Sequence, residues 1–311
     1  MIRSILLAAL GAGLAAGCQQ SPPPAGKPLV VASFYPLFEF ARHVAGDRAE
    51  VVSLVPPGVE PHDWEPSPQT LVEIGRARVF VYNGAGFEPW VGKLLGEVAG
   101  RKIAVVDATK GMDLLPVDPA GGAAPARSGD AGRSAGPVDP HVWLDPVLAQ
   151  SQVEAIRAAL EEADGAHASV YADNARAFRA RLGELDAAFQ AGLRDCAHRD
   201  LVVSHASFGY LGRRYRLTQV PIMGLAPESE PSPAALAAIA TVARRRDVRY
   251  IFFETLVSPR LAETLAREIG AQTLVLNPIE GLTREEAATG KGYVDLMAAN
   301  LENLRRGLEC R

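Results

Sequence analysis

The chain has 311 residues, 48% of them apolar, and is longer than the roughly 100–200 residues of one typical domain. We therefore expect two lobes with a sizeable core. Its 32 basic and 36 acidic residues are mixed along the sequence and give a formal net charge of -4. A nucleic-acid-binding domain needs a clustered basic face, so nucleic acid is excluded as a partner.

The first 17 residues have the anatomy of a signal peptide. Arg3 precedes an apolar run over residues 5–16, which is shorter than the roughly 20 residues of a membrane-spanning helix. Residues 1–17 are therefore expected to be removed on export. The following cysteine completes a sequence that resembles the lipobox of bacterial lipoproteins, Leu14-Ala15-Ala16-Gly17-Cys18. Cys18 is thus the expected lipid anchor to the membrane, with a Pro-rich tether over residues 18–28; an ordinary secretory peptide with an incidental cysteine is the alternative.

The chain contains three cysteines. If Cys18 carries lipid, Cys196 and Cys310 remain as an even pair in an oxidising compartment, where disulfides persist. A Cys196–Cys310 disulfide is therefore predicted, and two unpaired thiols are the alternative.

Short β-branched runs alternate with helical patterns in the first half of the mature chain, which predicts βαβ units and a mostly parallel sheet. We assign residues 29–168 to an N-terminal α/β lobe, with strands over residues 29–33, 50–55, 78–83 and 102–107. Residues 117–138 are dominated by Gly, Ala, Pro and Ser and contain no His. Such a composition buries little apolar surface, so a flexible surface loop is expected there.

Residues 169–196 contain no Pro and place apolar side chains at spacings of three and four, which predicts one long amphipathic helix. At 1.5 Å per residue it spans roughly 40 Å, enough to connect two lobes. A second alternating series follows over residues 197–311, with strands at 201–204, 219–223, 249–253 and 273–276. The predicted fold is two α/β lobes joined by one long helix, with a cleft between them.

Metal-capable side chains follow several predicted strands. In open parallel sheets, ligands bind beyond the carboxyl ends of the strands. His205, Glu254 and Asn277 each come directly after a strand of the C-terminal lobe.

Two further histidines, His62 and His141, each follow a proline in a loop of the N-terminal lobe. Proline restricts the backbone beside the imidazole and so favours a preformed ligand position. Three imidazoles with one open or oxygen-donor position form a tetrahedral zinc shell. The neighbouring Asp63 and Asp145 are expected to orient the rings.

The ordered motifs around these residues resemble those of the zinc- and manganese-binding solute-binding proteins of ABC importers. The motifs are Pro56-Pro57-Gly58-Val59-Glu60-Pro61-His62, Asp139-Pro140-His141-Val142-Trp143-Leu144-Asp145-Pro146, Val203-Ser204-His205, Phe253-Glu254 and Leu276-Asn277-Pro278. The resemblance covers nearly the whole mature chain. It implies two α/β lobes bridged by a long rigid helix, with metal bound in the cleft by residues from both lobes.

The resemblance makes His62 and His141 the ligands from the N-terminal lobe and His205 a ligand from the C-terminal lobe. Manganese-selective members usually have Glu where His205 stands, and a nitrogen donor suits Zn²⁺ better than Mn²⁺. The family's fourth ligand is commonly an Asp at the position of Asn277. The fourth donor is therefore left open between the Asn277 carbonyl oxygen, Glu60, Glu254 and water, with Glu254 ranked as a supporting residue.

The expected function is that of an exported, monomeric lipoprotein in the periplasm or at the cell surface. It would capture Zn²⁺ as a transported substrate and deliver it to an ABC permease, without being an enzyme. One alternative is a zinc hydrolase with Glu60 or Glu254 as the general base, and another is a manganese-binding member of the family. An adhesin or a metal chaperone would share the same site.

Overall fold

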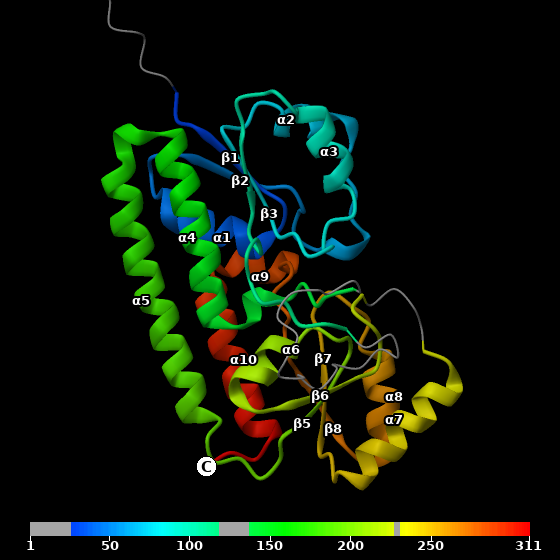
Figure 1. Ribbon diagram of the computed structural model, residues 1–311. Helices are drawn as coiled ribbons and strands as arrows, with labels where there is room; N and C mark the ends of the chain where they lie inside the picture. The colour runs from blue at the N-terminus through cyan, green and yellow to red at the C-terminus, as the bar shows by residue number, and fades with distance from the viewer. Residues whose placement is uncertain (1–25, 118–136, 227–230) are drawn as a thin grey trace, which may run out of the picture.

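The computed structural model describes residues 26–117, 137–226 and 231–311 (Figure 1). Within them the chain forms two four-stranded sheets with strand orders β2-β1-β3-β4 and β6-β5-β7-β8, and all the neighbouring strands are parallel. The two orders are the same when β1–β4 are matched to β5–β8. The expected architecture of two α/β lobes with mostly parallel sheets is thereby confirmed.

The N-terminal lobe surrounds the first sheet. Its elements in chain order are β1 (Leu29–Ala32), α1 (Tyr35–Ala45), β2 (Glu50–Ser53), the 3-10 turn η1 (Pro61–Asp63), α2 (Pro68–Ile74), β3 (Val79–Tyr82), α3 (Val91–Val98), β4 (Ala104–Asp107), the 3-10 turn η2 (Val142–Leu144) and α4 (Pro146–Ala163). The central strands β1 and β3 are almost wholly buried. This burial on both faces explains the near-continuous β-branched runs in their sequences.

The C-terminal lobe repeats this plan. After the 3-10 turn η3 (Gly165–His167) and α5 (Ala168–Gly192) come β5 (Asp200–Val203), α6 (Gly209–Tyr215), β6 (Thr218–Pro221), α7 (Pro233–Arg245), β7 (Tyr250–Phe253), α8 (Arg260–Ile269), β8 (Gln272–Val275), α9 (Arg284–Thr289) and α10 (Tyr293–Gly307). All eight strands expected from the sequence are present, with bounds within two residues of the predicted ones.

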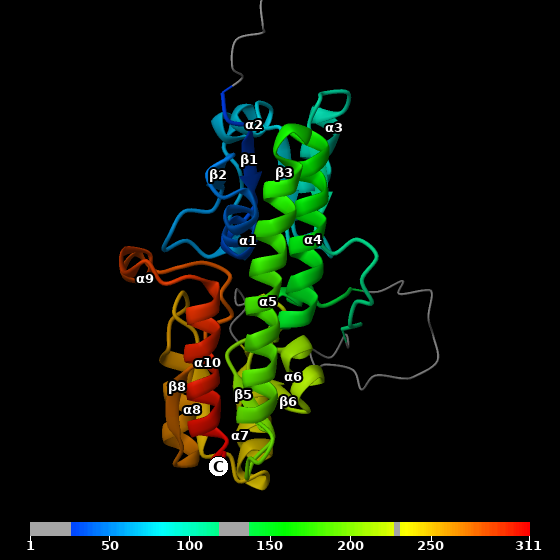
Figure 2. The ribbon, with the colours of Figure 1, turned by 90° about the vertical axis from the view of Figure 1, so that its left-hand side faces the viewer.

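The long helix α5 runs along both lobes (Figures 1 and 2). It packs against α1 and α4 of the N-terminal lobe and against α10 of the C-terminal lobe. Its buried stripe consists of the apolar residues expected from the helical spacing: Tyr171, Ala175, Phe178, Leu182, Leu185 and Phe189. The helix ends at Gly192, earlier than the predicted residue 196. The next carbonyls, of Leu193 and Arg194, accept hydrogen bonds from the Arg199 guanidinium instead of from the backbone of a further turn.

One apolar core extends through both lobes. It includes Phe40 of α1, Phe178 and Phe189 of α5, Phe252 of β7 and Leu304 of α10. The two sheets are therefore separate in topology but share a core through the helices beside them.

The predicted disulfide between Cys196 and Cys310 is confirmed; it links the segment after α5 to the end of the chain. The signal peptide over residues 1–17, the anchor Cys18 and residues 118–136 of the expected loop lie outside the described residues. Within the described parts, no helix combines the length and the apolar character needed to cross a membrane.

Candidate metal centre

Four side chains from separate parts of the sequence meet between the lobes: His62, His141, His205 and Glu280. His62 lies in η1, and His141 directly precedes η2. His205 follows β5, and Glu280 follows β8. One possible ligand atom from each lies within 4.8 Å of the others. Three of the four are the histidines singled out in the sequence.

The three imidazoles point their Nε2 atoms toward a single carboxylate oxygen. Glu280 Oε1 lies 3.5 Å from His62 Nε2, 3.1 Å from His141 Nε2 and 3.2 Å from His205 Nε2. The Nε2 atoms of His141 and His205 are 3.4 Å apart. Ligands at about 2.0–2.1 Å from a tetrahedral zinc ion would be roughly 3.3 Å from one another. These separations therefore match the edges of a zinc coordination tetrahedron.

His205 is held by the strand ends of its own sheet. Glu254, directly after β7, accepts hydrogen bonds from His205 Nδ1 at 2.7 Å and from the His205 backbone N–H at 3.2 Å. Because a carboxylate only accepts, Nδ1 carries the proton and the neutral ring offers Nε2 as a ligand. Glu254 thus fixes the orientation of the His205 ring.

His141 is oriented in the same way by Asp139. The Asp139 carboxylate accepts from His141 Nδ1 at 2.8 Å and from the His141 backbone N–H at 2.9 Å. The expectation that Asp145 orients this ring was wrong, since Asp145 caps the N-terminus of α4 and pairs with Arg214. The next turn is fixed to the other lobe, because Trp143 Nε1 donates to the Pro278 carbonyl at 2.8 Å.

His62 has a different environment. Its ring packs edge-on against Phe87, with centroids 4.7 Å apart. Its backbone N–H donates to Glu60 Oε1 at 3.3 Å, so Glu60 caps the turn that carries the imidazole. Asp63 is exposed and makes no hydrogen bond to the ring within the described structure, which corrects the role expected for it.

Asn277, one of the candidates for the fourth donor, does not enter the cluster. Its Oδ1 accepts from the Ile279 backbone N–H at 2.7 Å and its Nδ2 donates to Glu286 at 3.0 Å. Both ends of the amide are therefore used to shape the turn after β8. Ile279 in this turn has φ 59°, a conformation that is strained for a β-branched residue. This turn places the carboxylate of the next residue, Glu280, beside the three histidines.

The centre is buried and strongly charged. His141, His205 and Glu280 are at most 1% exposed. Burial would lower the pKa of His205, but the charges of Glu254 and Glu280 outweigh it and raise that pKa well above its ordinary value. Burial would raise the pKa of Glu280, but the facing His205 and His62 hold it well below its usual range.

Two buried polar atoms of the centre, His62 Nε2 and Glu280 Oε2, have no hydrogen-bond partner among the described residues. Buried polar groups nearly always have a hydrogen-bond partner. Nitrogen and oxygen atoms without one, in a cluster of this kind, are expected where they bind a cation. The donor set of three imidazole nitrogens and one carboxylate oxygen suits Zn²⁺.

Sequence reasoning missed Glu280 and the role of Asp139. Glu280 lies three residues beyond the strand-end residue Asn277, within the turn that follows β8. Inspection of the whole turn after each strand would have included it. Asp139 lies two residues before His141, within a motif already recognised, and could have been weighed beside Asp145.

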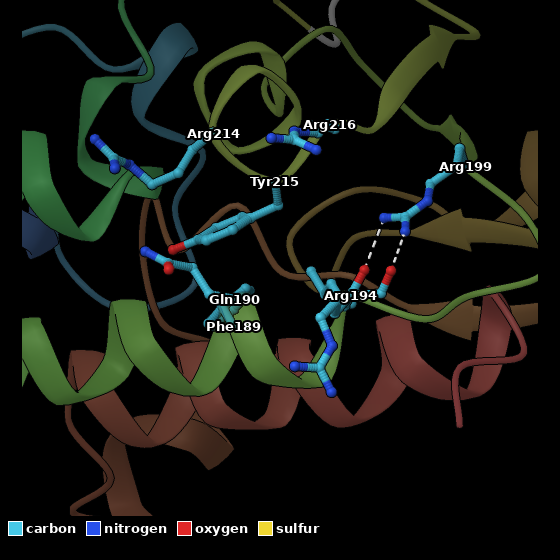
Figure 3. Close-up of a pocket in the computed structure, with 8 residues that line it drawn as sticks. Phe189, Gln190, Arg194, Arg199, Arg214, Tyr215 and Arg216 are labelled. Atoms are coloured by element: carbon cyan, nitrogen blue, oxygen red, sulfur yellow. Dashed lines mark hydrogen bonds between the residues drawn. The ribbon is translucent and has the colours of Figure 1, made fainter.

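A separate cavity of about 340 Å³ lies beside the C-terminal part of α5. Its lining residues are Phe189, Gln190, Leu193, Arg194, Arg199, Arg214, Tyr215 and Arg216 (Figure 3). Several of the guanidinium groups already have partners. Arg199 donates to main-chain carbonyls, Arg214 pairs with Asp145, and Arg194 pairs with Asp195. This cavity shares none of the four residues of the metal centre.

The fold and the centre together define a two-lobed metal-binding protein, and comparisons with known proteins identify its family. Residues 30–307 match the family model described as zinc-uptake complex component A, periplasmic (ZnuA). The chain is 39% identical over 279 residues to the high-affinity zinc uptake system protein ZnuA of Bacillus subtilis, which covers 90% of this chain and 87% of that protein. The chain therefore belongs to the ZnuA family.

Two further relatives are similar over most of this chain. The zinc-binding lipoprotein AdcA of Streptococcus pneumoniae strain R6 is 39% identical over 97% of this chain, which spans 60% of that longer protein. The crystal structure of the Zn(II)-bound ZnuA-like domain of Streptococcus pneumoniae AdcA superposes with a TM-score of 0.78 at 39% identity, over 91% of this chain and 100% of that one.

Proposed function

We propose that this chain binds one Zn²⁺ ion outside the cytoplasm through His62, His141, His205 and Glu280 and delivers it to the permease of an ABC importer. The observation that carries the proposal is the convergence of three histidine Nε2 atoms on one buried carboxylate oxygen, at separations of 3.1–3.5 Å. Membership of a zinc-uptake family and the zinc named for two relatives support zinc as the transported substrate.

The ligand set also favours a binding protein over a zinc hydrolase. Catalytic zinc sites have three protein ligands and keep one position for water, whereas four protein ligands close the shell. The general bases considered from the sequence are poorly suited. Glu254 accepts a hydrogen bond from the His205 ring, and Glu60 accepts one from the His62 backbone N–H, so both carboxylates already hold histidines of the site. We infer that the chain is not an enzyme.

Zinc is favoured over manganese by the same donors. Three nitrogen ligands suit Zn²⁺, whereas Mn²⁺ is best served by oxygen. The Glu280 carboxylate also lowers the net charge of the ion together with its ligands from +2 to +1. Three neutral imidazoles and a neutral amide would leave that net charge at +2.

The proposal is tested by titrating the metal-free protein with Zn²⁺ in competition with a chromophoric chelator. One tight equivalent per chain is expected, and Glu280→Gln should weaken it while keeping the shape of the side chain. His167→Gln is the matched control, because His167 lies at the start of α5 with a partly exposed ring paired to Asp164. A wild-type protein without a tight zinc equivalent would refute the proposal.

Delivery and localisation need a cellular test. Cells that lack this protein should require added zinc for growth, and the wild-type gene should restore growth in zinc-limited medium. Cys18→Ala should release the protein from the membrane fraction if Cys18 carries the lipid anchor. Growth without added zinc in the deletion strain would argue against a role in import. We further propose that the protein acts as a monomer.

A further inference from the structure

The loop after β3, residues 83–88, has an unusual backbone. Gly84, Ala85 and Gly86 all have positive φ angles of 83°, 54° and 81°. Gly84 also has no room for a side chain, since a Cβ there would lie 2.3 Å from Asp107 Oδ1. Glycine adopts positive φ readily, so the conformational cost of this turn falls on Ala85, the one residue of the three with a Cβ. Such a loop persists only where its surroundings hold it in place.

The group that holds this loop is the carboxylate of Glu88, which is 9% exposed. Its Oε1 accepts from the Asn83 backbone N–H at 2.7 Å and from Ser33 Oγ at 2.6 Å. Its Oε2 accepts from the Gly84 backbone N–H at 3.1 Å. Successive backbone N–H groups in such a turn form a concave site for an anion, and here the anion is a side chain of the same loop.

Burying this carboxylate is unfavourable. Burial raises the pKa of Glu88 to about 7, although the bonds from Ser33, Asn83 and Gly84 oppose the rise. A buried polar group of this kind is stabilised only while its partners are present. The loop and the carboxylate therefore depend on each other.

The loop contacts both histidine segments of the N-terminal lobe. Phe87 packs against His62 with ring centroids 4.7 Å apart, and against Trp143 at 5.2 Å. Asn83 Nδ2 donates to the carbonyl of Pro140 at 2.9 Å, directly before His141. The Asn83 amide is itself fixed, because Gln152 of α4 donates to its Oδ1 at 3.1 Å.

We propose that Glu88 is a positioning residue for the metal centre, which sets His62 through Phe87 and His141 through Asn83 and Pro140. The proposal rests on the proposed zinc-binding function. It assigns the placement of both histidines of the N-terminal lobe to one buried carboxylate. Within the described part of the chain, this carboxylate is hydrogen-bonded to Ser33, Asn83 and Gly84 and to none of the four proposed ligands.

A merely structural role for Glu88 predicts a different result from a positioning role. Loss of a buried carboxylate that accepts hydrogen bonds leaves its donors unpaired and lowers stability, but only loss of a positioning residue changes the ligand geometry. Glu39 is the matched control: it is 2% exposed, belongs to the same lobe, and bonds to Arg42 and His43 of its own helix.

The experiment uses Co²⁺, whose d–d absorption reports coordination geometry, on the full mature chain. Wild-type protein should bind one Co²⁺ per chain with a tetrahedral spectrum. Glu88→Ala should weaken metal affinity by about 10–100-fold, as expected for removal of a group that orients ligands, and should alter the spectrum. Glu88→Gln should lie between them, because its amide oxygen still accepts from Asn83 while the Gly84 N–H loses its acceptor.

Glu39→Gln should lower the denaturation midpoint and keep the wild-type affinity and spectrum. Asn83→Ala, which leaves Glu88 intact, should change the spectrum less than Glu88→Ala and carries the test if that variant does not fold. Wild-type affinity and spectra in both Glu88→Gln and Asn83→Ala would overturn the proposal, as would an equal spectral change in Glu39→Gln. Absence of Co²⁺ and Zn²⁺ binding by the wild-type chain would instead refute the zinc-binding function, and this proposal with it.

Discussion

The two lobes have the same strand order but present their histidines differently. In the C-terminal lobe, His205 lies two residues after β5, and its acceptor Glu254 directly follows the adjacent strand β7. In the N-terminal lobe, His62 and His141 lie in loops well beyond β2 and β4, and other loops hold them through Phe87, Asn83 and Trp143. A sheet edge fixes a ligand with few contacts, whereas a loop ligand needs a supporting network.

Among the three histidines, His62 differs most from His205, because no carboxylate in the described structure accepts a hydrogen bond from its ring. His205 is completely buried, while the side chain of His62 is 9% exposed. We therefore expect the site to tolerate more displacement of His62 than of His205, and the following measurements compare the ligands of the two lobes directly.

The largest effect is expected from His205→Ala. Apparent zinc-binding free energies of about 10–16 kcal/mol for four-ligand sites imply a loss of about 100-fold or more for one ligand. The substitution also leaves the Glu254 carboxylate buried without its imidazole, so His205→Ala should weaken zinc binding more than His62→Ala does. Competition titration of both variants checks the order. A larger loss in His62→Ala would contradict the proposed difference between the lobes.

The next largest effect is expected from the carboxylates that orient the rings. Glu254→Gln and its N-terminal counterpart Asp139→Asn should each weaken zinc affinity by about 10–100-fold. If the new amide turns its nitrogen toward the imidazole Nδ1–H, it cannot accept the hydrogen bond that the carboxylate accepted. The tautomer with the proton on Nδ1, which leaves Nε2 free to bind metal, is then disfavoured. Zinc titration and the Co²⁺ spectrum measure this effect. Asp145→Asn is the control for affinity, because the Asp145 carboxylate caps α4 and pairs with Arg214, and among the described residues it accepts no hydrogen bond from His141.

The fold could be predicted from the sequence almost completely, because parallel strands buried on both faces require β-branched runs that are visible without a structure. His205 and Glu254 could be found for a similar reason, since strand ends are readily located. His62 and His141 were indicated by the neighbouring prolines and by the family resemblance.

Glu280 could not be placed by the same reasoning. Its approach to the histidines depends on the left-handed conformation of Ile279, and a β-branched residue gives no sequence signal for that conformation. The choice between Asp139 and Asp145 likewise depends on the backbone around Pro140 and on α4, whose N-terminus Asp145 caps. Such features are decided by tertiary contacts.

A smaller effect is expected from pH. Burial would lower the pKa values of both His141 and His205, but neighbouring carboxylates raise them in the metal-free protein, and that of His205 rises well above its ordinary value. Zinc requires neutral imidazole, so affinity should fall as pH falls and binding should release protons near pH 7. Calorimetry in buffers of different ionisation enthalpy measures the release. In NMR titrations of the metal-free protein, His205 should keep its proton to a higher pH than His141; the reverse order would contradict this prediction.

The smallest effect on zinc affinity is expected from the disulfide. The bond closes a loop with a sequence separation of 114 residues, and loss of a native disulfide typically costs about 2–5 kcal/mol. Cys196 lies before the amino end of β5, whereas His205 lies beyond its carboxyl end. The double variant Cys196→Ser, Cys310→Ser should therefore unfold at lower denaturant concentration with unchanged zinc affinity. A large change in affinity would show that the metal centre is sensitive to the distant edge of its own lobe.

The core that runs from Phe40 through α5 to Leu304 also has a consequence for folding. Lobes with separate cores can unfold independently, but a shared core couples the two halves into one cooperative unit. Calorimetry should then give a single transition with equal calorimetric and van't Hoff enthalpies, and either half expressed alone should not fold. An ion bound between the lobes would raise the melting temperature of the entire molecule, so the cell's proteases would encounter fewer unfolded copies when zinc is abundant.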